Sequence, residues 1–189
     1  MLPMNSGLPG VCRPRVYLAG PDVFLRDSAH VFAELLARCE ALGLEGVPPS
    51  DGGLGSDPAA RVLPGDALAQ RIYEGNIALI RSADGVLANL SAFRGHEPDP
   101  GTVFEVGFAV ALGKPVVGYG VAPGSYADRI RAVLPCEQDA LGDWREAASG
   151  TLVEGLGQRL NLMLTRSSAL EDSAEAALAA LARRLLQPS

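Results

Sequence analysis

The sequence predicts an α/β protein in which a parallel sheet of about five strands is covered by helices on both faces. Segments of strand character alternate with segments of helical period along the chain, as in βαβ units. The strand segments are apolar throughout, which is typical of strands buried on both faces. A length of 189 residues suits a single compact domain. We expect that domain to cover residues 15–189, after a flexible leader over 1–14.

The first half of the domain shows two strands and two helices. Residues 15–21 predict a buried strand that ends at its Gly-Pro, and 27–42 repeat apolar residues at helical spacing up to a glycine stop. A second strand is expected over 44–47. Residues 50–64 are rich in Gly, Asp and Pro and predict a long loop, a type of segment that often serves as a substrate lid. Helical period returns over 65–83.

The middle of the chain repeats the alternation. A buried strand over 85–90 is followed by a polar loop over 91–101, a helix over 102–112 and a strand over 115–119. In parallel sheets ligands bind beyond the carboxyl ends of the strands, where the strand order reverses. The loops that follow the first four strands meet at that edge, and polar residues concentrate in them.

The last third of the chain is less regular. Residues 126–133 and 143–148 have the pattern of short helices, and 151–153 are expected to form the last strand. The amphipathic segment at about 170–186 predicts a C-terminal helix with Leu170 on its inner face.

Composition excludes several classes of partner. The formal net charge of −6 disfavours a nucleic acid, and the absence of like-charge runs disfavours an anionic membrane surface. The apolar stretches fall short of the ~20 residues that span a bilayer, and 1–14 lack the order of a signal peptide. The three cysteines, Cys12, Cys39 and Cys136, are odd in number and widely spaced, which indicates a reducing cytoplasm.

The segment 93–109 holds the main candidate site. It places Asp99 on a loop and Glu105 in what we expect to be the first turn of a helix. Thr102 and Glu105 have the spacing of a capping box, which would give Glu105 a purely structural role. A carboxylate at the ligand edge of the sheet, near a helix N-terminus, also suits a nucleophile. Local pattern leaves both interpretations open.

Two further polar residues stand in apolar surroundings. Asn76 interrupts a helix stripe, where it could bind a substrate or satisfy a backbone group. Tyr17 lies near the carboxyl end of the first strand, where its hydroxyl could orient a carboxylate. His96 is expected to be a solvated loop residue.

Other familiar schemes lack their motifs. The sequence has no Gly-rich phosphate loop after a strand and no G-x-S-x-G elbow. It has only two histidines, without ligand-spaced partners, so no metal is expected.

Together the motifs resemble the nucleoside 2-deoxyribosyltransferase family. The D-x-G-T-x-x-E-x-G-x-A string from Asp99 to Ala109 is the most specific of them. The other matching pieces come in the family's order and lie at 16–24, 72–90 and 161–163.

The resemblance implies a flavodoxin-like, doubly wound sheet and a retaining two-step glycosyl transfer without a cofactor, acting on nucleosides and free nucleobases. It makes Glu105 the nucleophile, Tyr17 the residue that positions it and Asp99 a carboxylate of the substrate site. It assigns Asn161 and Met163 to a neighbouring subunit's site, so a homo-oligomer is expected. Further substrate contacts are expected at Gly20, Asp22, Phe24, Asp51, Asn76 and Gly101.

One position departs from the family pattern. Many members carry an aspartate that protonates the departing base where this chain has Asn76, and an amide cannot donate a catalytic proton. Asp99, another acid or solvent must then supply it.

Two alternatives remain. The first is an N-glycosidase of deoxynucleoside 5′-monophosphates, disfavoured because Asp22 and Asp99 would repel a phosphate. The second is a non-catalytic flavodoxin-like nucleotide-binding module, disfavoured because no phosphate loop follows the first strand.

Overall fold

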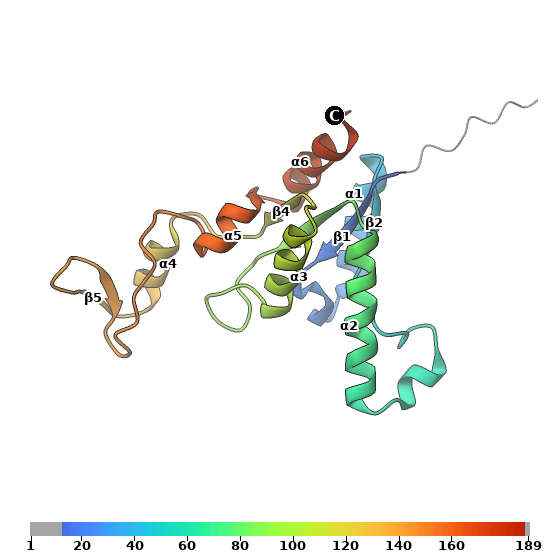
Figure 1. Cartoon of the computed structure of the whole chain (residues 1–189), viewed down its shortest axis with the longest axis horizontal. Helices are drawn as coiled ribbons and strands as arrows, with labels where there is room; N and C mark the ends of the chain where they lie inside the picture. The colour runs from blue at the N-terminus through green and yellow to red at the C-terminus, as the bar shows by residue number, and fades with distance from the viewer. Residues whose placement is uncertain (1–12, 188–189) are drawn as a thin grey trace, which may run out of the picture.

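The computed structural model describes residues 13–187, and its centre is a five-stranded parallel sheet (Figure 1). The strands are β1 (Arg15–Ala19), β2 (Glu45–Val47), β3 (Gly85–Asn89), β4 (Val116–Tyr119) and β7 (Ala169–Leu170). Their order in the sheet is β2-β1-β3-β4-β7. This is the flavodoxin-like order, so the predicted fold class is confirmed. The order reverses between β1 and β3, which fixes where a ligand site is expected.

Helices cover both faces of the sheet, as the continuous apolar strands predicted. The helices are α1 (Ser28–Ala41), α2 (Gly65–Ser82), α3 (Pro100–Ala111), α4 (Tyr126–Val133), α5 (Leu162–Ser167) and α6 (Ala174–Leu186). On one face of the sheet Val16, Leu18 and Leu87 pack against α1 and α6. On the other face Tyr17 and Val86 pack with residues of α2 and α3. Alternate residues of each strand thus serve two separate cores.

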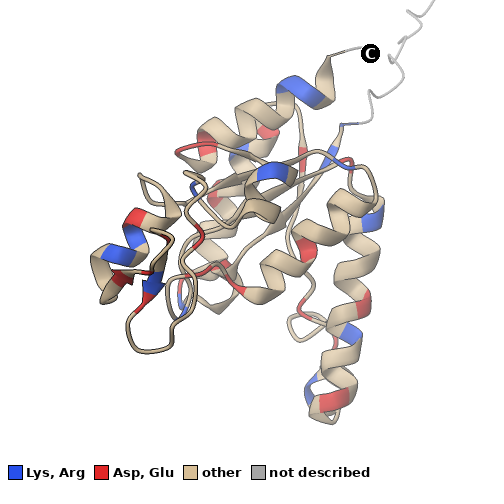
Figure 2. Cartoon of the chain, turned by 60° about the vertical axis from the view of Figure 1, so that its left-hand side comes forward, with Lys and Arg blue, Asp and Glu red and all other residues tan. Residues whose placement is uncertain are grey.

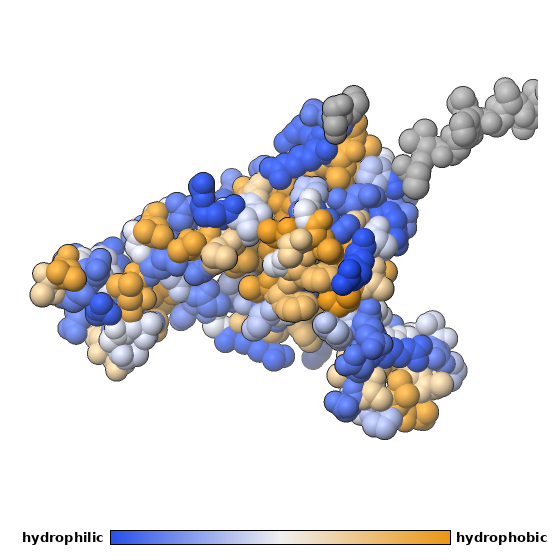
Figure 3. Space-filling model, in the orientation of Figure 1, coloured by the Kyte–Doolittle hydropathy of each residue, from blue (hydrophilic) through white to orange (hydrophobic). Residues whose placement is uncertain are grey.

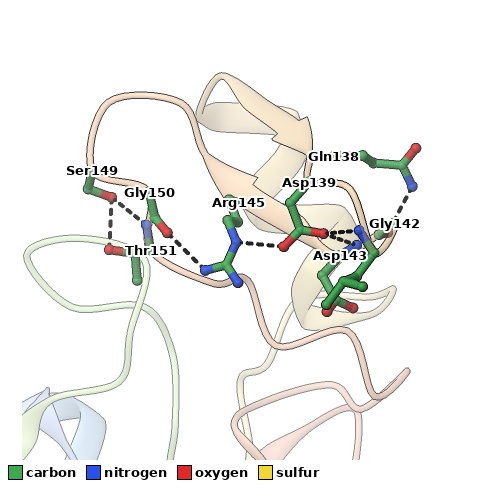
Figure 4. Close-up of polar contacts among 9 residues, drawn as sticks. Gln138, Asp139, Gly142, Asp143, Arg145, Ser149, Gly150 and Thr151 are labelled. Carbon is green, nitrogen blue, oxygen red and sulfur yellow. Dashed lines mark hydrogen bonds and ion pairs between the residues drawn. The ribbon is translucent and has the colours of Figure 1, made fainter.

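The segment 143–148 is a hairpin strand, so the helix predicted there is wrong. Strand β6 (Trp144–Glu146) pairs antiparallel with β5 (Cys136–Gln138). The Asp139 carboxylate accepts hydrogen bonds from the Asp143 amide and, at 2.7 Å, from Arg145 Nε (Figure 4). These bonds across the turn hold the hairpin together. The residues of 143–148 favour a helix by local pattern, and that pattern does not show the bonds to Asp139.

The fifth strand lies later in the chain than predicted. Residues 151–153 contribute only an isolated bridge, between Leu152 and Arg145. The sheet is completed by β7, which pairs with β4, so Leu170 is a strand residue and α6 begins only at Ala174. A two-residue strand is too short to show a period, which is why the pattern missed it.

The remaining predictions concern loops and termini. Residues 50–64 form the expected long connection, with a short 3₁₀ helix, η2 (Pro58–Val62), inside it. The predicted leader lies outside the described residues except for 13 and 14. Acidic and basic side chains are interspersed in the view of Figure 2. Within 13–187, no helix has both the length and the apolar character that a membrane span requires.

Candidate functional site

A cavity of about 460 Å³ opens at the carboxyl ends of β1 and β2, against the N-terminal part of α3. Its size is that of a small-molecule site. Seven predicted site residues line it: Gly20, Phe24, Asp51, Asn76, Asp99, Gly101 and Glu105. Segments that are up to 85 residues apart in sequence therefore meet at the point where the strand order reverses.

Glu105 lies in the second turn of α3 and points toward the sheet, not toward the start of its own helix. The Tyr17 hydroxyl donates a hydrogen bond of 2.6 Å to Glu105 Oε1. The capping box considered for Thr102 and Glu105 does not form, because α3 begins at Pro100 with Asp99 as its N-cap. The expectation that Glu105 occupies the first turn is therefore wrong by one turn.

The surroundings of Glu105 raise the pKa of its carboxyl to about 7. Burial is the largest cause, because a half-buried carboxylate loses hydration. The hydrogen bond from Tyr17 lowers this pKa and the charge of Asp99 raises it. Burial and the Glu105 charge in turn raise the pKa of Tyr17 far above its usual value, so Tyr17 is a permanent donor.

Asp99 forms the start of the helix that carries Glu105. Its Oδ2 accepts hydrogen bonds from the Thr102 amide at 2.8 Å and from the Thr102 hydroxyl at 3.0 Å. A side chain built on Gly101 would approach that carboxyl to 3.0 Å. Asp99 thus combines a structural role with a place on the cavity wall.

The opposite wall comes from the loop after β2 and from α2. Asn76 accepts a hydrogen bond of 2.7 Å from the Ser50 amide through Oδ1. Asp51 accepts bonds from the amides of Gly53 and Gly55, and these two bonds lower the pKa of its carboxyl. Because two amides of its own loop donate to it, the Asp51 side chain remains a carboxylate beside the cavity.

An aromatic stack that the sequence analysis did not identify borders the cavity. Phe24 stacks on Phe93 with ring centroids 5.4 Å apart, and the Arg94 guanidinium lies over both rings. Arg94 has a φ of 53°, a left-handed conformation that is uncommon for a residue with a side chain. The signal in the sequence was an aromatic residue shortly after each of two adjacent strands.

Asp22 lies beneath the cavity wall and not on it. It is only 7% exposed, and Asn89 Nδ2 donates to both of its carboxylate oxygens at 3.0 Å. A Cβ on Gly20 would come within 2.6 Å of Asp22 and 2.8 Å of Asn89. Gly20 is thus required for close packing here, and Asp22 holds the ends of β1 and β3 together.

Asn161 and Met163 lie on the other side of α3. They line a second hollow together with Val103, Gly107 and Val110 of that helix. Asn161 is the N-cap of α5, and Met163 is 71% exposed. Within one chain these two residues line a different hollow from Glu105. No cluster of three or more potential metal ligands occurs in the described residues.

Comparison with known proteins agrees with this arrangement. The model of the family described as nucleoside 2-deoxyribosyltransferase matches residues 16–163. A structure titled 2-desoxiribosyltransferase from Leishmania mexicana superposes with a TM-score of 0.67 at 27% identity, covering 90% of this chain and 97% of that one.

Two other similar proteins carry no stated activity. A conserved protein from Enterococcus faecalis shares the fold, with a TM-score of 0.56 at 22% identity over 92% of this chain and 99% of its own. An uncharacterized protein of Schizosaccharomyces pombe is 36% identical over 120 residues, 63% of this chain. The match spans 56% of the yeast protein, little more than half its length.

Proposed function

Because the chain belongs to the nucleoside 2-deoxyribosyltransferase family, we propose that it transfers a 2-deoxyribosyl group between nucleobases through a covalent intermediate on Glu105. The observation that carries this proposal is the Tyr17–Glu105 hydrogen bond at the wall of a cavity of nucleoside size. A carboxylate held in place by a hydroxyl is the arrangement that a nucleophile requires.

The reaction proceeds in two displacements at C1′ of the sugar. Glu105 attacks C1′ through an oxocarbenium-like transition state, and the C1′–N bond to the first base breaks. A second nucleobase then attacks C1′ from the vacated side, which regenerates Glu105 and restores the original configuration. Water in place of the second base gives a slower hydrolysis. Both steps need only the carboxylate, so no cofactor is required.

Tyr17 acts as a positioning residue in this scheme. Its hydroxyl holds Oε1 of Glu105, so the carboxylate is oriented before the sugar arrives. The bond also favours the ionised form of Glu105 against the effect of burial. Near pH 7 Glu105 is therefore divided between the reactive carboxylate and the unreactive acid.

A neighbouring subunit is proposed to complete the site. Helix α3 contains Glu105 as its single charged residue, and that side chain points inward. The outward face of α3 presents Phe104, 52% exposed, beside Phe108, and Tyr73 of α2 continues the aromatic surface. Figure 3 shows hydrophobic residues gathered in the middle of the molecule, where Figure 1 places α3. Such a face is typical of an interface, and a second copy is the partner that would bring Asn161 and Met163 to a site.

The substrates are proposed to be nucleosides and free bases in place of nucleotides. No Lys or Arg is among the described residues that line the cavity, and the Arg94 guanidinium beside it lies over the rings of Phe24 and Phe93. A phosphate site needs cationic or backbone donors that face the ligand. The sequence analysis disfavoured a phosphate because of the charges of Asp22 and Asp99. Since Asp22 is buried beneath the wall, only Asp99 still supports that argument. The free thiols of Cys39 and Cys136 fit a cytoplasmic enzyme of nucleoside salvage.

The function is tested by mixing the protein with deoxyinosine and free adenine and following deoxyadenosine by chromatography. Exchange is expected in the wild type and should disappear in Glu105→Ala, because Glu105 is the carboxylate that accepts the Tyr17 hydroxyl among the described residues. Hydrolysis of a deoxynucleoside monophosphate without any exchange would support the N-glycosidase instead. Persistent exchange in Glu105→Ala would exclude Glu105 as the nucleophile.

Glu105→Gln provides a control for folding. Since folding raises the pKa of Glu105 from 4.5 to about 7, the wild type loses stability as pH rises through that window, by about 3 kcal/mol in total. Glutamine has no charge to bury, so this variant should be inactive but more stable at pH 8, with little difference at pH 4.5. Denaturant unfolding at the two pH values measures this.

A further inference from the structure

We propose that the described residues of one chain supply no proton donor for the departing base at this site, and that the Asn76 amide instead holds the base by a hydrogen bond while the base leaves with its electron pair. The inference rests on the proposed function and assigns a substrate class to it. Deoxynucleosides whose bases are stable without an added proton are the ones this site would cleave fastest.

The acidic side chains on the cavity wall all accept hydrogen bonds that favour their ionised forms. Among the described lining residues the acids are Asp51, Asp99 and Glu105, and no His, Lys, Tyr or Cys accompanies them. Asp51 uses one carboxylate oxygen for the Gly53 amide at 2.7 Å and the other for the Gly55 amide at 2.8 Å. Both amides are donors, so they favour the carboxylate over the acid.

Asp99 and Glu105 also accept hydrogen bonds. Asp99 accepts two bonds from Thr102 as the N-cap of α3, both on Oδ2, and these donors favour its carboxylate form. Its Oδ1 faces no such donor among the described residues, so Asp99 is the residue that the test must separate from Asn76. Glu105 accepts the Tyr17 hydroxyl and forms the new bond to C1′, so it must enter the reaction without its proton. The same carboxyl cannot attack the sugar and protonate the base in one step.

The orientation of the Asn76 amide is fixed by its partner. Ser50 presents a backbone N–H to Asn76 at 2.7 Å, and only the carbonyl end of an amide accepts such a bond. The loop is packed closely on α2 here, since a Cβ on Gly75 would lie 2.7 Å from Ser50 Oγ. The NH₂ end of Asn76 is therefore left to donate to a ligand in the cavity.

The chemical step balances without an acid. The C1′–N bond breaks and its electron pair stays on the base, while an oxygen of Glu105 bonds to C1′. Negative charge develops on a ring nitrogen or carbonyl oxygen of the base, where the Asn76 N–H donates a hydrogen bond. Water protonates the base after it leaves. A base that carries an N7-alkyl group departs neutral and needs no proton.

The test compares leaving groups in a single turnover. Formation of the deoxyribosyl adduct on Glu105 is followed by mass spectrometry with thymidine, deoxyuridine, 5-fluorodeoxyuridine, deoxyinosine and N7-methyldeoxyinosine. In the wild type the rate should rise roughly fivefold or more for each unit by which the base is more acidic. N7-methyldeoxyinosine should react fastest of the purines.

Two variants separate the possible donors. Asn76→Asp keeps the acceptor for the Ser50 amide but adds an acid. The rate of adduct formation should then depend only weakly on the acidity of the base, and activity should fall at alkaline pH. Asp99→Asn keeps the N-cap and should leave the steepness unchanged. The inference is overturned if the wild-type rate depends only weakly on the acidity of the base, or if that dependence becomes strong only in Asp99→Asn.

Failure of the proposed function gives a different result. If no adduct forms on Glu105 even with N7-methyldeoxyinosine, the transferase itself is excluded, and this inference with it. If adducts form readily but at rates independent of the base, the transferase stands and only the inference is lost.

Discussion

The carboxyl group of Glu105 lies between two side chains with opposite effects on its pKa. Tyr17 stabilises the carboxylate by donating a hydrogen bond, and Asp99 destabilises it by its charge. Burial has the largest effect on this pKa, and it comes from the packing of the fold around Glu105. The reactivity of this residue is thus set by neighbours that are 88 and 6 positions away in sequence.

The pH profile of kcat/KM is predicted to separate these two neighbours. In the wild type activity should rise with pH through about 7, the pKa of Glu105, because in the proposed mechanism only the ionised carboxylate attacks. Tyr17→Phe removes a bond that lowers this pKa and should move the rise to higher pH. Asp99→Asn removes a charge that raises it and should move the rise to lower pH. Shifts of both variants in the same direction would contradict this assignment.

At the scale of the element, α3 determines the geometry of the site. Asp99 begins the helix one turn earlier than the T-x-x-E pattern suggested, and this rotates Glu105 away from its own N-terminus and toward β1. Pro100 at the first helical position reinforces that start. The helix then presents three surfaces, to the cavity, to the sheet and to the exterior.

The contribution of the N-cap is predicted from a pair of variants at Asp99. Both Asp99→Ala and Asp99→Asn remove the charge beside Glu105, but asparagine still accepts the bond from the Thr102 amide. The alanine variant should therefore be less stable than the asparagine variant by about 1 kcal/mol. Urea unfolding at one pH measures the difference, and equal stabilities would show that the cap contributes nothing.

At the scale of the whole molecule, the strand order β2-β1-β3-β4-β7 brings distant loops to one edge. It also leaves Asn161 and Met163 on the far side of α3 from Glu105. A single chain therefore holds Glu105, the proposed nucleophile, and the proposed partner residues in separate hollows, which only an assembly could unite.

Assembly through α3 is predicted to be necessary for activity. Phe104→Glu places a charge on the outward face of that helix and should yield a smaller, inactive species by light scattering. Val133, 55% exposed on α4, provides the matched control, since Val133→Glu adds the same charge outside this face. Unchanged size and activity in Phe104→Glu would exclude this surface.

Mixing two inactive variants tests whether sites are shared. Glu105→Ala supplies intact Asn161 and Met163, and Asn161→Ala supplies an intact nucleophile. If a neighbour completes each site, mixed oligomers should regain part of the exchange activity that each variant lacks. No recovery after verified subunit exchange would place both groups in one chain.

The sequence by itself determined the alternation of strands and helices, the ends of α1, α2 and α4 to within a residue or two, and the family to which the chain belongs. These features depend on local period, on glycine and proline stops and on a short motif, and each of these signals lies within a short stretch of the sequence. The parallel sheet followed from strands without polar alternation, because such strands must be buried on both faces.

Only the tertiary structure decided the start of α3, the β5–β6 hairpin, the two-residue strand β7 and the burial of Asp22. Each depends on partners far away in sequence: Tyr17 for Glu105, Arg145 for Asp139, β4 for β7 and Asn89 for Asp22. A hydrogen bond or a buried charge depends on the residues that lie beside it in space. When those residues are distant in sequence, local pattern cannot predict the contact.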